Sequence, residues 1–214
     1  MILARRELLC GWAAMLATRP ALAAGPVTDL LGRIAKARAP VRTLQGPFTQ
    51  TRTIGLLSTD VRSTGSLTLV RPDSLRWRLD PPDDITFWVG SEGVAYRSAH
   101  GHGRLPATNG RMASALRDLH ELLGGDPSRL ADRWSITVLR DDATGAQIQA
   151  LPLASDASAL DSAVARRLEL VLAADLVRPT RVLLAQGDHD RTAIVFGDLA
   201  INAPVDESSM RPPG

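Results

Sequence analysis

The sequence predicts a mainly β (α+β) fold, in which a curled antiparallel sheet of about ten strands has its concave face covered by two or three short helices. Three observations predict it. Apolar and polar residues alternate in short segments that recur between turn residues, as in antiparallel strands. Two other segments space their apolar residues by three and four, the period of an amphipathic helix. Residues 24–214 are enough to form one hydrophobic core.

The first residues of the chain are typical of an export signal. Arg5 and Arg6 precede an apolar run from Leu8 to Ala17, and Ala21-Leu22-Ala23 provides small residues for cleavage. The run is shorter than the ~20 residues that span a bilayer. The only cysteine, Cys10, lies inside this signal and does not follow the small residues of a lipid-attachment site. We therefore expect residues 1–23 to be removed and residues 24–214 to form a single domain; the paired arginines leave the general secretory and twin-arginine routes open.

The charge of the mature protein excludes one class of function. The chain has 25 basic and 23 acidic residues, and the signal holds three of the arginines and one glutamate, which leaves 22 of each. Because the net charge is near zero and the arginines are scattered, we expect no nucleic-acid surface and no anionic-membrane surface.

The first half of the mature chain predicts one helix and then a series of strands. The helix covers 28–38, with Leu30, Leu31 and Ile34 on one face and Pro40 after its end. Alternation and turn residues then predict a meander of strands. These strands cover 48–53, 63–70, 74–79, 85–89 and 94–97.

The second half returns to strands after a helical segment. His100–Gly103 reads as a flexible stretch, and Gly110–Leu123 as an amphipathic helix stopped by Gly124-Gly125. A second short helix is expected to begin at Pro127, after Asp126 as its cap, and to end at about Asp132. Strands are predicted at 134–139, 146–151, 167–173, 180–185 and 191–196, and 154–165 reads as a surface excursion.

Arg71 stands where the strand pattern calls for an apolar residue. It shares one face with Leu67 and Leu69, so we expect it to point inward. In the next strand Arg76 and Arg78 are expected to face water. A second interpretation of Arg71 remains open, in which its stem covers apolar surface while its head reaches solvent at the strand end.

Residues that could carry chemistry are few. The histidines, His100, His102, His120 and His189, lack the spacing of a zinc site. No G-x-S-x-G elbow and no phosphate-binding glycine loop occurs in the sequence. We therefore predict no catalytic residue, no metal and no cofactor, and the protein is not expected to be an enzyme.

Three segments resemble the LolA-type outer-membrane lipoprotein carriers. They are LQGPFTQTR at Leu44–Arg52, GSLTLVRPDSLRW at Gly65–Trp77, and FGDLAINAPVD at Phe196–Asp206, followed by Pro212-Pro213-Gly214. The F-x-Q and R-P-x-x-L-x-W elements are fairly specific in combination. The resemblance implies an incomplete antiparallel β-barrel of about ten to eleven strands covered by a lid of short α-helices. Met210, where the family usually has phenylalanine, and the 154–165 segment depart from the family pattern.

The resemblance also implies a site. Arg71 matches the family arginine that hydrogen-bonds main-chain carbonyls of the lid, so we predict it to be the lid latch. The residues predicted to line the lipid cavity and the lid are Phe48, Leu67, Leu69, Leu75, Trp77, Leu79, Met112, Leu116, Leu119 and Leu123.

The function that the resemblance implies is that of a periplasmic shuttle. It would hold the acyl chains of lipoproteins in an apolar half-barrel cavity, receive them from an inner-membrane ABC transporter, and pass them to a lipid-anchored outer-membrane acceptor. A soluble monomer without a lipid anchor is expected. Two alternatives remain: a carrier or sensor of another acylated lipid or glycolipid, and a small esterase, which the missing nucleophile elbow disfavours.

Overall fold

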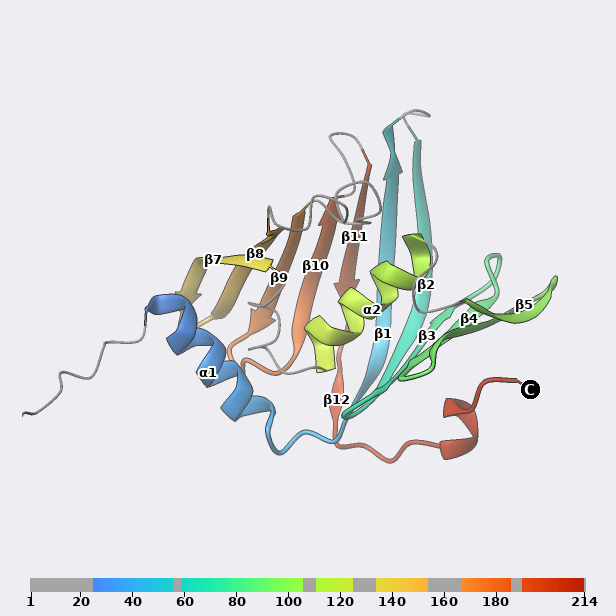
Figure 1. The fold of residues 1–214 in the computed structure, drawn as a ribbon, viewed down its shortest axis with the longest axis horizontal. Helices are drawn as coiled ribbons and strands as arrows, with labels where there is room; N and C mark the ends of the chain where they lie inside the picture. The colour runs from blue at the N-terminus through green and yellow to red at the C-terminus, as the bar shows by residue number, and fades with distance from the viewer. Residues whose placement is uncertain are drawn as a thin grey trace, which may run out of the picture.

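The computed structural model shows a large antiparallel sheet with two helices packed on one face (Figure 1). It describes residues 25–55, 59–105, 111–124, 134–153, 167–185 and 190–213, and for 111–115 the backbone alone. The expected second short helix from Pro127, the 154–165 excursion and the signal at 1–23 all lie outside the described residues.

The sheet runs in the order β6-β5-β4-β3-β2-β1-β11-β10-β9-β8-β7, and the short β12 pairs with β1. Its first half contains β1 (Thr43–Ile54), β2 (Thr59–Val70), β3 (Ser74–Leu79), β4 (Ile85–Gly90), β5 (Gly93–Ser98) and β6 (Gly101–Leu105). Its second half contains β7 (Trp134–Asp142), β8 (Gly145–Pro152), β9 (Arg167–Ala173), β10 (Pro179–Ala185), β11 (Arg191–Phe196) and β12 (Ala200–Ile201). The end strands β6 and β7 do not pair with each other in this order, so the barrel is incomplete, which confirms the predicted fold class.

The join between the two halves brings an early and a late segment of the chain together. β1 pairs with β2 on one side and with β11 on the other, and Phe48 lies opposite both Gly65 and Phe196. These pairings link segments far apart in the sequence. The first and last segments that carry the family resemblance are therefore neighbours in the sheet.

Alternation along the strands separates two faces of the sheet. In β9, Leu168, Leu170 and Leu172 are at most 2% exposed, while Glu169 and Val171 between them are partly exposed. We call the face that carries these leucines, toward α1 and α2, the helix face, and the opposite face the outer face.

The helices have the predicted positions. α1 (Pro26–Arg38) begins with proline in its first turn and buries Leu30, Leu31 and Ile34 against the sheet. α2 (Arg111–Gly124) crosses the helix face near β1 and β2 (Figure 1). A short 3₁₀ helix, η3 (Glu207–Met210), lies near the C-terminus.

Two predictions from the sequence are wrong. The stretch His100–Gly103 is not a flexible loop, because Gly101–Leu105 forms the edge strand β6 and pairs with β5. Its glycines and exposed side chains hide the alternation that normally identifies a strand. Arg76 does not face water as Arg78 does, because the η3 helix packs against β3 and leaves the Arg76 side chain half-buried.

Candidate functional site

The helix face brings the predicted apolar residues into one buried cluster. Leu67 is 0% exposed and Leu69 is 1% exposed, and neither is reached by water. Phe48 stacks on Trp77 with ring centroids 3.7 Å apart. The cluster contains Phe48, Leu67, Leu69, Leu75, Trp77, Leu116, Leu119 and Leu123, with Leu79 partly buried against it. The side chain of the remaining predicted residue, Met112, lies outside the described ones.

The apolar layer is closed in this conformation. The sheet residues of the cluster are almost completely buried, and α1 and α2 contribute side chains to the same cluster. A hydrocarbon chain can therefore contact Leu67 or Leu69 only after the groups that cover them move.

α2 approaches the sheet closely at its last residue. A Cβ atom added to Gly124 would lie 2.7 Å from Cδ1 of Leu69, which is inside van der Waals contact. Because glycine has no side chain, the end of α2 can rest directly on β2.

Arg71 points to the helix face, as predicted, and its Nη1 donates a hydrogen bond to the carbonyl oxygen of Arg38. Arg38 is the last residue of α1, so this bond ties the end of β2 to α1. The resemblance suggested a bond to a lid carbonyl. The described acceptor for Arg71 belongs to α1 and not to α2.

The residue that reaches α2 is Arg38. Its Nη1 donates a 2.9 Å hydrogen bond to the carbonyl oxygen of Leu122. Arg71 therefore bonds to the end of α1, and Arg38 of α1 bonds to α2. We call this pair of arginines the arginine relay. Sequence reasoning missed Arg38, although it follows Ile34 by four residues and Leu31 by seven, and so lies on the apolar stripe of α1.

Burial lowers the pKa of one side chain in each of the two helices. Arg38 is 3% exposed, and burial, followed by the charge of Arg71, lowers its pKa to about 10, against an opposing effect of Asp175. Burial also lowers the pKa of His120 in α2, opposed by the charges of Asp73 and Glu121 and by a hydrogen bond with the Pro72 backbone. Both groups are therefore less easily charged than in water.

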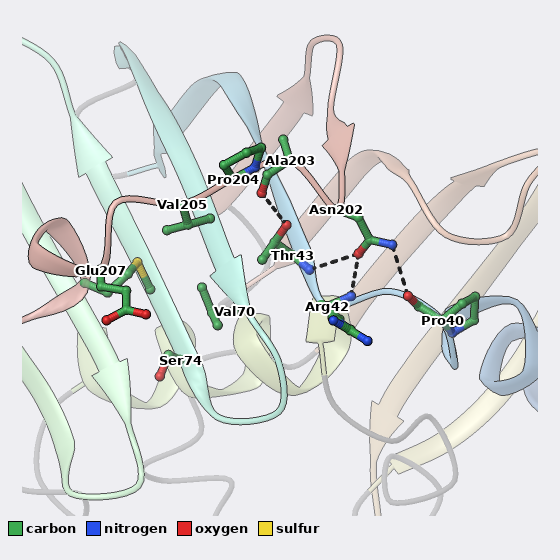
Figure 2. Close-up of a pocket in the computed structure, with 11 residues that line it drawn as sticks. Pro40, Arg42, Thr43, Val70, Ser74, Asn202, Ala203, Pro204, Val205 and Glu207 are labelled. Carbon is green, nitrogen blue, oxygen red and sulfur yellow. Dashed lines mark hydrogen bonds between the residues drawn. The ribbon is translucent and has the colours of Figure 1, made fainter.

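Part of the outer face is covered in a different way, by the C-terminal segment at 202–213. The Asn202 side-chain oxygen accepts hydrogen bonds from the backbone N–H of Arg42 (2.7 Å) and of Thr43 (3.3 Å), and its amide donates to the Pro40 carbonyl (3.0 Å). Thr43 Oγ1 in turn donates to the Ala203 carbonyl at 2.8 Å. Figure 2 shows these bonds, with the segment in front of the strands and α2 behind them.

The C-terminal segment lines an open pocket of about 620 Å³ together with residues of β1, β2 and β3. Further along, Trp88 Nε1 donates to the Ser209 carbonyl at 2.9 Å, and Asp206 caps η3. Met210, the departure from the family pattern, lines this pocket and a second pocket beside Trp88.

The remaining candidate groups do not come together. His100 and His102 are exposed at β6, and His189 lies outside the described residues. Within the described ranges, no three His, Cys, Asp or Glu side chains are placed to hold a metal ion. None of the described helices has the length and apolar character needed to cross a membrane.

Comparison with known proteins gives a family and a fold. A family model described as outer membrane lipoprotein carrier protein LolA matches residues 39–210. No curated protein matches the chain.

Among solved structures, MucB is 18% identical with a TM-score of 0.51, over 89% of this chain and 64% of MucB. A DUF1329 family protein from Desulfovibrio piger is 9% identical with a TM-score of 0.50, over 86% of this chain and 95% of that protein. A LolA superfamily protein from Nitrosomonas europaea is 9% identical with a TM-score of 0.47, over 86% and 97%. At these identities the likeness to MucB and to the DUF1329 protein concerns the fold alone.

Proposed function

This chain belongs to the LolA family of outer membrane lipoprotein carrier proteins, and from that premise we propose that it carries the acyl chains of lipoproteins on its helix face. It would take them from the inner membrane and release them at the outer membrane. Binding and release involve no chemical change of the cargo, so the protein acts as a carrier and not as an enzyme.

One observation carries the proposal: a continuous layer of buried aliphatic and aromatic side chains, covered by two helices, on a sheet that is not closed into a barrel. Each methylene that enters such a layer from water gains about 0.8 kcal/mol. An acyl chain can replace the apolar contact between the end of α2 and Leu69, because both kinds of contact are apolar.

The arginine relay is the proposed latch of this lid. A hydrogen bond from a charged donor contributes about 1.5–3 kcal/mol, which favours the closed position by roughly ten- to hundredfold. Burial of a few methylenes of cargo exceeds that amount, so cargo can open the lid. Arg71 keeps its predicted role in this proposal, acting through Arg38 and α1.

We propose the periplasm as the site of action, after removal of residues 1–23 as an export signal. The proposed donor is an inner-membrane ABC transporter, and the proposed acceptor is a lipid-anchored outer-membrane protein. The domain at 24–214 would act as a monomer.

Native mass spectrometry of the protein purified from its own periplasm tests the proposal. A bound acylated peptide supports the lipoprotein carrier. A bound lipid without a peptide supports the alternative, a carrier or sensor of another acylated lipid or glycolipid. Protein that is empty, and stays empty after incubation with an acylated lipoprotein in detergent, contradicts both.

A matched pair of variants locates the binding face. Leu69→Asp places a charge in the helix face and should abolish cargo binding, whereas Val195→Asp, at a residue that is 52% exposed, should leave it unchanged. Equal binding by both variants would place the cargo elsewhere.

A further inference from the structure

The arginine relay leaves buried donors without acceptors. Among the described residues, Nε and Nη2 of Arg38 and Nε of Arg71 are buried and have no hydrogen-bond partner. Arg38 itself is 3% exposed, so bulk water does not solvate its charge. Leaving such donors unsatisfied costs free energy, which an acceptor at this place would recover.

The free atoms of Arg38 form a binding edge. Its Nη1 is engaged by the Leu122 carbonyl, whereas Nε and Nη2 lie side by side on the other edge of the planar guanidinium. That edge presents two parallel N–H groups, which match the two oxygens of a carboxylate or of a phosphate. An anion at this edge would therefore not compete with the Leu122 carbonyl for Nη1.

The acidic group that acts on Arg38 does not fill this role. Asp175 is the acidic group whose charge raises the pKa of Arg38. Its carboxylate already accepts hydrogen bonds from the backbone N–H of Val177 (2.9 Å) and of Arg178 (3.0 Å), and from Arg178 Nε (2.6 Å). Asp175 is thus paired with its own turn, and Arg38 carries a buried positive charge beside Arg71.

We propose that the free edge of Arg38, beside Arg71, binds the anionic group of an amphiphile, a carboxylate or a phosphate, whose hydrocarbon part lies on the helix face. The proposal rests on the binding of acyl chains proposed above and specifies its alternative form, a carrier of another acylated lipid, because it selects cargo with a negative charge at one end of its acyl chain. Arg38 is suited to this place, since it follows the apolar residues of α1 and contacts the end of α2.

A pair of fluorescent probes tests this on the full mature chain. cis-Parinaric acid and its methyl ester have the same hydrocarbon chain and differ in charge. We expect the acid to bind roughly ten- to hundredfold more tightly than the ester, as a charge-assisted hydrogen bond predicts. Equal affinities would overturn the anion site and leave the proposed function intact. Failure of both probes to bind would contradict the proposed function as well.

Variants assign the preference to Arg38. Arg38→Met keeps a long side chain without the charged edge, so the acid should bind as weakly as the ester. Arg78→Met, at an exposed arginine of the outer face, is the matched control and should keep the preference for the acid. An unchanged preference in Arg38→Met would overturn the assignment. The ratio of the two affinities is the readout, because a change in lid opening affects both probes alike.

Two further measurements do not depend on a variant that folds. The first uses ¹³C-carboxyl palmitate on the unaltered protein. The bound carboxylate should stay ionised at a pH where the free acid is protonated. A bound carboxylate that titrates with its ordinary pKa would contradict the site. Acetate in tenfold excess over the probe should not displace parinaric acid. Displacement by acetate would overturn the assignment to an amphiphile in favour of a small free anion.

Discussion

The two faces of the sheet are covered in different ways. On the helix face, α1 and α2 bury leucines that are nearly inaccessible to water, and the arginine relay links the end of β2 to α1 and α1 to α2. On the outer face, the C-terminal segment is held by side-chain hydrogen bonds at Asn202, Thr43 and Trp88, and η3 has no buried residue.

This difference determines whether a ligand can displace the helices or the C-terminal segment from the sheet. A hydrocarbon chain can replace the apolar contacts of a helix at little cost, but it offers no donors or acceptors to replace those of Asn202. The helix face therefore suits reversible binding of acyl chains, while the C-terminal segment is suited to stay in place.

The largest expected effect follows from the burial of the helix face. Leu170→Ala removes a side chain that is 2% exposed, and we expect a loss of about 2–5 kcal/mol in the free energy of unfolding. Val195→Ala, at an outer-face residue that is 52% exposed, should change it by less than about 0.5 kcal/mol. Urea unfolding of both variants measures the contrast, and similar losses would remove the distinction between the faces.

The two bonds of the arginine relay predict that Arg38→Met loosens α2 more than Arg71→Leu does. Arg38→Met should speed hydrogen exchange of the α2 amides by roughly ten- to hundredfold, because it removes the bond to Leu122. Arg71→Leu should loosen the end of α1 first and α2 less, and should accept cargo but deliver it poorly. If Arg71→Leu frees α2 more than Arg38→Met does, the relay does not act through Arg38. Normal delivery by Arg71→Leu would remove its latch role.

The C-terminal segment predicts a smaller, local effect. Asn202→Gly keeps the positive φ of 56° but removes the side-chain hydrogen bonds to three backbone groups. Because these bonds are solvent-exposed, we expect a loss of about 1–2 kcal/mol. Hydrogen exchange should rise at 203–212 and stay unchanged in α2. A rise in α2 as well would show that the two covers are coupled.

Two glycines distinguish a free helix surface from a packed one. Gly32 in α1 has no atom within 4 Å of an added Cβ, so Gly32→Ala should stabilise the protein by about 0.5–1 kcal/mol. Gly124→Ala forces Leu69 to shift and should lose that gain. Thermal unfolding of the two variants measures the difference, and an equal gain would mean that α2 does not rest on β2.

The smallest expected effect depends on pH. The pKa of His120 is lowered in the folded protein, so the unfolded chain binds more protons. The stability from neutral His120 is complete above about pH 6.5, the unfolded value, and is lost as the pH falls through the lower folded pKa. Unfolding of the protein and of His120→Gln between pH 5 and 8 measures this, and the variant should show the weaker pH dependence. Parallel pH profiles would contradict it.

Most of the fold follows from the sequence pattern. β3, β9 and β11 have the predicted bounds, because strict alternation requires a strand with one buried face. The pattern failed at β6, whose strand conformation comes from pairing with β5, and at Arg76, which a segment more than 120 residues later covers.

The apolar part of the site was predictable and its polar part was not. Residues such as Leu67, Leu69 and Trp77 are placed on one face by alternation alone. The partner of Arg38, the Leu122 carbonyl, is 84 residues away and belongs to the backbone. Side-chain identity carries no information about such an acceptor, since every residue has a carbonyl group.

The sequence by itself determined which side chains are apolar, the period at which they recur, and hence one buried face on an antiparallel sheet with amphipathic helices to cover it. These properties are local, because the strand and helix periods follow from backbone geometry. Only the tertiary structure decided that Arg38 links α1 to α2, that its second edge has no hydrogen-bond partner, and that the C-terminal segment packs on part of the outer face. Those contacts join segments distant in the chain, and their geometry exists only when the sheet has formed.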